Sequence, residues 1–230
     1  MNTSHSATMP VRGATTETTR FYMGSLMSFL VKSSETQNSL CLVEYRSRPG
    51  HEPPPHIHLD QDEVFYLLEG ELEVYCLGQV RIARAGEAMF LPRNQAHAWY
   101  VTSSTIRALV MTSPGGLDGY FEEMSSPATG MELPPAATTY VQADPTEAIA
   151  TGEKHGIKIL TPAETTELLP HYPGFGLPRA QRSGLTSRPS RAQTEVDSLP
   201  KRMRENAVPS KCRPCFAPKA RETVNCDCSH

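Results

Sequence analysis

From Phe21 onward, short runs of apolar, aromatic and β-branched residues follow one another, with turn-forming residues between them. Glu69-Gly70 and Ala85-Gly86 are two of these turn signals. No helical period separates the runs, and many short strands with close turns indicate an all-β sandwich or barrel. The runs that predict strands are 21–31, 39–46, 63–68, 71–76, 80–83, 88–91, 97–101 and 106–112.

Two segments show a clear periodicity of apolar residues. In residues 71–75, Glu71 and Glu73 alternate with apolar residues, which predicts a half-exposed strand. Residues 117–124 have apolar side chains at the i, i+3, i+4 and i+7 positions, which predicts one short amphipathic helix. Asp118 is expected on the solvent side of this helix.

Composition divides the chain into a barrel and less regular flanks. Hydrophobic residues make up 38% of the chain and there are 20 prolines, which indicates a core accompanied by poorly ordered stretches. Residues 176–230 contain 11 Lys and Arg and 5 Asp and Glu, which is a net charge of +6. The rest of the chain contains 11 Lys and Arg and 20 Asp and Glu, which is a net charge of −9, and the two sum to −3. We expect a disordered lead at 1–20, a barrel at 21–126, an extension packing on the barrel at 127–173 (an extended wrap at 127–150, a last strand or hairpin arm at 154–160) and a disordered basic tail at 174–230.

Charge and hydropathy narrow the classes of partner. A net charge of −3 gives no reason to expect nucleic acid or an anionic membrane as a partner. No window approaches the roughly 20 apolar residues needed to span a bilayer. Residues 1–20 have no apolar core of a secretory signal, so a cytoplasmic protein is expected. Cys41 and Cys76 lie in strand-like runs and are expected to be small buried hydrophobes.

Four residues predict a metal site. Residues two apart in a strand point to the same face, so His56 and His58 project two imidazoles into one cavity. Glu63 opens the next run and can reach the same cavity, and His97 on a later strand supplies a third imidazole. This mixed nitrogen and oxygen set suits one divalent ion of Fe, Mn, Ni, Cu, Co or Zn, and it leaves one or two positions open for water or substrate.

These residues resemble the two motifs of the cupin superfamily. The first, G-x5-H-x-H-x4-E-x6-G, is matched from Gly50 to Gly70 at every fixed position, and the second is matched at Gly86, Pro92 and His97. The second motif departs at Asn94 and Val101, where the family has Gly and Asn; Asn tolerates left-handed backbone angles, so the turn can survive. The resemblance implies a double-stranded β-helix (jelly-roll) barrel and a homodimer, with residues 21–31 as the pairing segment.

Within cupins, the segments 62–66 and 112–118 are similar to small quercetin 2,3-dioxygenase-like proteins. This resemblance implies that Glu63 both ligates the metal and acts as the catalytic base toward a substrate hydroxyl. The predicted function is a metal-dependent dioxygenase for a phenolic, flavonol-like or polyketide-type small molecule of secondary metabolism. Two alternatives stay open: a non-redox metal-dependent isomerase, cyclase, dehydratase or decarboxylase, and a small-molecule binding module without turnover.

The alternation of side chains along a strand predicts which residues lie beside the metal. Phe65 and Leu67 share the Glu63 face and Trp99 shares the His97 face, so they are predicted to bind substrate, with ordinary core packing as the alternative. His51 is expected at the barrel mouth, and Gln61 is a less well spaced substitute for Glu63. The tail contains half of a zinc-knuckle layout, formed by Cys212, Cys215, Cys226 and Cys228. The favoured interpretation is that these cysteines are incidental.

Overall fold

A computed structural model describes residues 11–135 and 144–175. The tail cysteines and nearly all of the expected basic tail lie outside these residues. The elements, in chain order, are β1 (Thr19–Tyr22), β2 (Ser25–Val31), the 3-10 turn η1 (Ser33–Glu35), β3 (Cys41–Ser47), β4 (His56–His58), β5 (Asp62–Glu69), β6 (Glu71–Cys76), β7 (Gln79–Arg84), β8 (Ala88–Leu91), β9 (His97–Val101), β10 (Ile106–Ser113), α1 (Leu117–Met124), β11 (Ser126–Pro127), α2 (Thr146–Lys154), β12 (Ile157–Ile159) and α3 (Pro162–Leu168).

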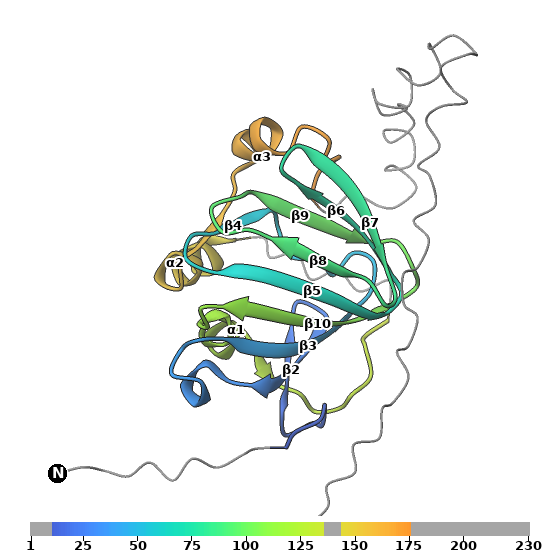
Figure 1. Cartoon of the computed structure of the whole chain (residues 1–230), viewed down its shortest axis with the longest axis vertical. Coiled ribbons are helices and arrows are strands. Elements are labelled where there is room, and N and C mark those ends of the chain that lie inside the picture. Colours follow the sequence, from blue (N-terminus) through green and yellow to red (C-terminus); the bar gives the residue numbers. More distant parts are fainter. Residues whose placement is uncertain (1–10, 136–143, 176–230) are drawn as a thin grey trace, which may run out of the picture. The chain divides into compact units, whose positions relative to one another are not determined.

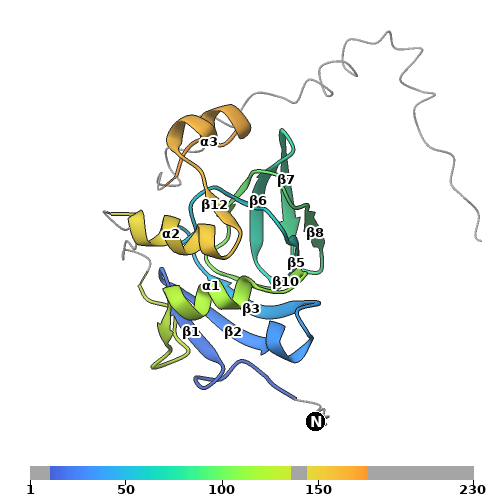
Figure 2. The same ribbon diagram turned by 90° about the vertical axis from the view of Figure 1, so that its left-hand side faces the viewer.

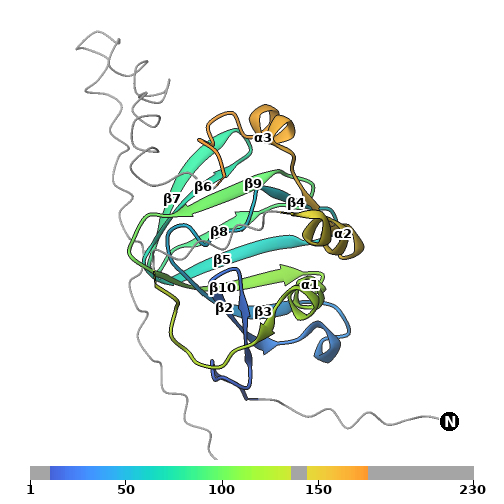
Figure 3. The ribbon, with the colours of Figure 1, turned by 180° about the vertical axis from the view of Figure 1, so that it is seen from behind.

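The strands form two antiparallel sheets that face each other. One sheet has the order β11-β1-β2-β3-β10-β5-β8 and the other has the order β12-β4-β9-β6-β7. Figure 1 shows the strands stacked one above another, with α1 and α2 at one end of the barrel and α3 beside the β6–β9 sheet. Seen from behind in Figure 3, α1 and α2 lie at the same end of the strands. The predicted all-β jelly-roll fold is confirmed.

Two hydrophobic clusters hold this arrangement together. The inner cluster fills the space between the sheets and includes Val43, Leu67, Leu72 and Ala108, each with an exposed fraction of 0%. The second cluster lies outside the β6–β9 sheet, where the C-terminal segment packs on it. Its buried members are Tyr75, Ala96, Ala98, Tyr100, Leu160, Leu169 and Tyr172.

This outer cluster changes one expectation for β6. Leu72 and Val74 are buried and Glu71 and Glu73 are half-buried, as the alternation predicted. Tyr75 lies on the carboxylate face, yet it is only 2% exposed. Its ring contacts Tyr172 at 5.2 Å between centroids, so an extension distant in sequence covers the outer face of the sheet.

The helix α1 has the predicted bounds, but the sequence pattern predicted the wrong environment for one of its residues. Leu117 and Tyr120 are buried, as expected of the apolar face. Asp118, which was expected on the solvent side, is buried instead. Its carboxylate accepts hydrogen bonds from the Ser33 amide (2.8 Å) and hydroxyl, which attaches α1 to η1.

Other boundaries also differ from the pattern. The run 21–31 is two strands, because Met23 and Gly24 adopt left-handed backbone angles (φ 46° and 81°) and reverse the chain. The expected wrap at 127–150 ends in α2, and the strand expected at 154–160 is shortened to β12. Figure 2 shows α1 and α2 side by side next to β12.

The helix α3 was missed, although the sequence carries a start signal for it. The Thr161 hydroxyl accepts a hydrogen bond from the Glu164 amide, and the Glu164 carboxylate accepts one from the Thr161 amide. Pro162 occupies the first turn, where its missing N–H costs nothing. No helix in the described part of the chain is long and apolar enough to cross a bilayer.

Candidate metal centre

The four predicted ligands come together from three strands. β4 supplies His56 and His58, and β9 supplies His97, whose Cα faces that of His56 across the strand pair. Glu63 comes from β5 in the opposite sheet, so the cluster bridges the two sheets inside the barrel. One donor atom of each residue lies within 4.8 Å of every other. The ligand set predicted from spacing is therefore assembled.

Each imidazole is held by a hydrogen bond to its Nδ1 atom. The Nδ1 atoms of His56 and His97 lie 2.8 and 3.1 Å from the carbonyl oxygens of Pro54 and Gln95. His58 Nδ1 lies 3.3 Å from Gln61 Oε1. A carbonyl only accepts hydrogen bonds, so each Nδ1 carries the hydrogen and each Nε2 presents its lone pair to the cluster. Gln61, considered as a substitute for Glu63, orients His58 instead.

The electrostatics of the cluster favour a cation. Burial lowers the pKa of His56 to about 4 and, with help from His56, that of His58 to about 3, so both rings are neutral at pH 7. Burial also lowers the pKa of His97 and raises that of Glu63 to about 8. Ionising a buried carboxylate without a counter-charge is costly, and a bound cation would offset that cost.

The buried polar atoms without hydrogen-bond partners also favour a bound cation. His58 Nε2 and Glu63 Oε2 are buried and have no hydrogen-bond partner, although 3.9 Å separates them. His97 Nε2 lies 3.6 Å from the same oxygen. Buried polar atoms are nearly always satisfied, so these convergent lone pairs fit a metal ion. Three imidazoles and one carboxylate suit a divalent first-row metal, while the ligand set does not identify which one.

The comparison with sequence families agrees with these motifs. Residues 43–113 match the family described as "Cupin domain". This chain contains a cupin domain. The match spans β3 to β10 and includes all four clustered residues, whereas β1, β2 and everything after β10 lie outside it.

Curated relatives of the cupin domain have several activities. The Bacillus subtilis (strain 168) quercetin 2,3-dioxygenase is 23% identical over 109 residues, which are 47% of this chain and 32% of that protein. The Triticum aestivum oxalate oxidase GF-2.8 is 33% identical over 72 residues, which are 28% of this chain and 32% of that protein. The chain thus spans about a third of the length of these relatives.

Solved structures similar to the cupin domain were also found. A predicted oxalate decarboxylase from Thermotoga maritima is 21% identical with a TM-score of 0.42, covering 46% of this chain and 99% of that one. An RmlC-like cupin from Shewanella frigidimarina is 23% identical with a TM-score of 0.37, covering 42% of this chain and 82% of that one.

The two departures from the second cupin motif are structurally accommodated. Asn94 adopts a left-handed backbone conformation (φ 60°), as expected for a residue in the place of glycine. Its amide donates to the His58 carbonyl at 2.7 Å, so this turn is attached to the strand of two ligands. Val101 is buried, and its amide donates to Glu52 Oε1 at 2.8 Å.

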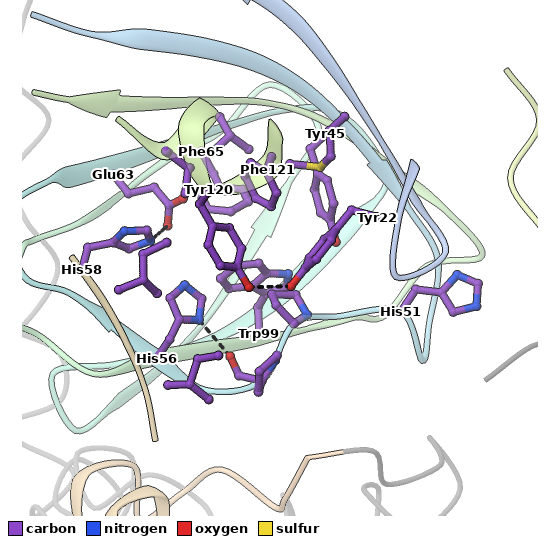
Figure 4. Close-up of a pocket in the computed structure, with 17 residues that line it drawn as sticks. Tyr22, Tyr45, His51, His56, His58, Glu63, Phe65, Trp99, Tyr120 and Phe121 are labelled. Carbon is purple, nitrogen blue, oxygen red and sulfur yellow. Dashed lines mark hydrogen bonds and ion pairs between the residues drawn. The ribbon is translucent and has the colours of Figure 1, made fainter. Parts of the chain in front are cut away.

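The cluster opens into a cavity lined by the cupin domain and its flanking segments. The empty space among the lining side chains is about 630 Å³ when its mouth is included. Figure 4 shows His56, His58 and Glu63 at one side, with aromatic side chains around the space beside them. The lining residues are Tyr22, Met27, Tyr45, His51, Pro53, Pro54, His56, His58, Glu63, Phe65, Trp99, Val110, Leu117, Tyr120, Phe121, Ile157 and Ile159.

Two of the three predicted substrate residues line this cavity. Phe65 and Trp99 do, with ring centroids 5.0 Å apart. Leu67 does not: it is fully buried in the inner cluster, two residues further along β5. His51, expected at the barrel mouth, borders the cavity but is buried; its Nδ1 lies 3.1 Å from the Gly24 carbonyl, and its ring points away from the tyrosines in Figure 4.

Several lining residues were not predicted. Tyr22 comes from β1, Tyr120 and Phe121 come from α1, and Ile157 comes from β12. The sequence placed Tyr120 and Phe121 on the apolar face of a helix. It carried no signal that this face would cover the four clustered residues, because that depends on how distant segments pack.

Proposed function

We propose that the chain is a mononuclear metal-dependent oxygenase that acts on a flat substrate carrying an acidic hydroxyl, such as a phenolic, flavonol-like or polyketide-type enol. The observation that carries this proposal is the position of the four-residue cluster on a cavity whose other lining is mainly aromatic and aliphatic. Such a lining removes a flat apolar ligand from water and leaves its polar group to the metal.

Charge separates this substrate class from a small dianion such as oxalate. A divalent ion with the Glu63 carboxylate and three neutral imidazoles carries +1. A substrate that binds through a neutral hydroxyl and passes its proton to Glu63 leaves the charge of the centre at +1, whereas a dianion changes it to −1. Among the described lining residues there is no lysine or arginine to offset that charge, and an unpaired charge in an apolar cavity is costly. The site therefore suits a substrate with a neutral hydroxyl better than a dianion.

His56, His58, His97 and Glu63 would hold the metal. A divalent ion there would acidify a substrate hydroxyl as a Lewis acid and, if redox-active, would permit reaction with oxygen. Glu63 Oε2 is the nearest carboxylate oxygen to the histidine Nε2 atoms and would accept the hydroxyl proton. Phe65 and Trp99 would orient the ring of the substrate and exclude water.

Metal analysis is the first test. The chain purified without chelators is expected to contain close to one divalent ion, measured by mass spectrometry, and His56→Ala and Glu63→Ala are expected to lose it. His171→Ala, which changes an exposed histidine, is the matched control and should retain the metal. Metal that is absent, or that survives both substitutions, would contradict the proposed centre.

Oxygen consumption is the second test. Quercetin is expected to support metal-dependent oxygen uptake, and oxalate is not. Turnover that is unchanged without oxygen would favour the non-redox alternative. Thermal stabilisation by quercetin without any turnover would favour the binding module.

A further inference from the structure

Two tyrosine hydroxyls meet in the cavity. The hydroxyls of Tyr22 in β1 and Tyr120 in α1 are 2.9 Å apart, as the dashed line in Figure 4 marks, and both residues are buried. Two hydroxyls carry two hydrogens, and their mutual hydrogen bond uses one. The described residues make no further hydrogen bond to this pair, so the second hydrogen is left to donate elsewhere.

Trp99 brings a weakly used donor to the same cavity. Its side chain is 5% exposed, and its Nε1 atom makes no hydrogen bond of ordinary length among the described residues, although the nearby Tyr45 hydroxyl is a weak acceptor for it. The indole can only donate, so it needs an acceptor. Its ring centroid lies 5.7 Å from that of His56, which places the indole next to the metal ligands.

Buried donors without acceptors lower stability unless a ligand satisfies them. Ordinary packing explains why aromatic rings line a cavity, but it would be served equally well by phenylalanine, which leaves no donor unpaired. The cavity is thus supplied with a hydroxyl donor that its own described residues do not use and an indole donor that they use only weakly. Because its described lining contains no lysine or arginine, a neutral oxygen acceptor matches it better than a second carboxylate.

We propose that Tyr22, Tyr120 and Trp99 form an acceptor-binding subsite that selects substrates with a carbonyl or ether oxygen in addition to the metal-binding hydroxyl. This inference rests on the proposed function for the hydroxyl end of the substrate. Tyr22 and Tyr120 both lie outside residues 43–113, so this selectivity comes from segments that flank the cupin domain.

Two probes of matched shape test the subsite. 4-(4-Hydroxyphenyl)butan-2-one carries a carbonyl where 4-butylphenol has a methylene group, and because that carbonyl is not conjugated with the ring, the two phenolic hydroxyls have similar acidity. Calorimetric titration of the Zn-loaded full chain is expected to give about tenfold tighter binding of the ketone, the usual effect of one additional hydrogen bond. Equal affinities, or binding of neither probe, would overturn the proposal.

The double variant Tyr22→Phe/Tyr120→Phe assigns the preference to the hydroxyl pair. Both partners of the hydrogen bond are replaced by apolar groups of the same shape, so the variant is expected to fold. The ketone preference is expected to fall to about twofold or less, while affinity for 4-butylphenol, which has no acceptor for the pair, changes much less. Tyr75→Phe, a buried tyrosine in the outer cluster, is the matched control and should keep the preference. A preference that persists in the double variant would overturn the role of the pair.

The indole can be observed directly, because Trp99 is the sole tryptophan of the chain. Its N–H gives one indole signal in a ¹H–¹⁵N spectrum, which is expected to move downfield with the ketone and much less with 4-butylphenol. The same shift with both probes would remove Trp99 from the subsite. Repeating the titrations after chelation separates the two proposals: a ketone preference with no dependence on metal would contradict the metal-bound hydroxyl and retain the subsite.

Discussion

At the scale of single residues, Gln61 determines how His58 faces the cluster. Its Oε1 atom accepts from His58 Nδ1, and its Nε2 atom donates to the Gly115 carbonyl at 3.4 Å, so it links a ligand to the segment before α1. Gln61→Leu is expected to weaken metal affinity by about 10–100-fold, because the partners that orient ligands have effects of that size.

Competition with a chromophoric chelator measures this effect of Gln61→Leu. Gln79→Leu, which changes an exposed residue of β7, is the control and should leave the affinity unchanged. An unaltered affinity in Gln61→Leu would mean that β4 holds His58 without help from the glutamine.

Gly70, the last fixed position of the first motif, is required by a close approach of the backbone. It adopts φ +86°, and a Cβ there would lie 2.3 Å from the Thr105 carbonyl oxygen. Gly70→Ala is therefore expected to lower the free energy of unfolding by about 2–5 kcal/mol, combining left-handed strain with a clash.

Gly78→Ala is the control for Gly70→Ala, because Gly78 is also left-handed (φ +66°) but has open space at its Cβ. Its expected cost is about 1–2 kcal/mol from backbone strain alone. Urea denaturation of both variants gives the comparison, and equal losses would show that the Thr105 contact relaxes freely.

At the scale of elements, β12 is the edge strand that pairs with the ligand strand β4. Ile157 and Ile159 are in register with His58 and His56, and both isoleucines line the cavity. Lys158 pairs with Ile57. On either side of this pair, the backbone amides of Leu59 and Leu160 donate hydrogen bonds between the two strands. Pairing with β12 therefore stabilises the strand that carries two residues of the candidate metal centre.

Lys158→Pro removes a donor from this pairing, and Lys158→Ala is its matched control at the same position. Both lose the ion pair with Glu164 (2.6 Å), so their difference isolates the backbone hydrogen bond. The proline variant is expected to be less stable than the alanine variant by about 1–3 kcal/mol, measured by denaturation, and to bind metal more weakly. Identical behaviour would show that β4 is held without β12.

At the scale of the whole molecule, the expected homodimer remains a prediction. Residues 21–31, proposed as the pairing segment, form β1 and β2, which pair with each other and with β3 of the same chain. They also supply Met27 and Phe29 to the inner cluster, so their deletion is expected to unfold the chain.

Light scattering on the intact chain is therefore the suitable measurement of oligomeric state. A dimer is expected to show twice the chain mass of 25.3 kDa. A mass of one chain at micromolar concentration would contradict the dimer.

The sequence by itself determined the barrel class, the helix at 117–124 and the four clustered residues. These features follow from local rules: period two in strands, period 3.6 in helices, and a spacing that places His56 and His58 on one face. The left-handed conformation of Asn94 (φ 60°) was also predictable from a local rule, because the tolerance of this angle depends on the residue's own side chain.

Only the tertiary structure decided what surrounds those ligands. Tyr22, Tyr120 and Ile157 reach the cavity from segments far apart in the chain, and Leu67 was excluded from it although its strand parity was right. Asp118 and Tyr75 were buried by partners that no local pattern specifies, Ser33 and Tyr172. Periodicity predicts which face of an element is apolar, but the neighbour that covers that face is set by the packing of the whole chain.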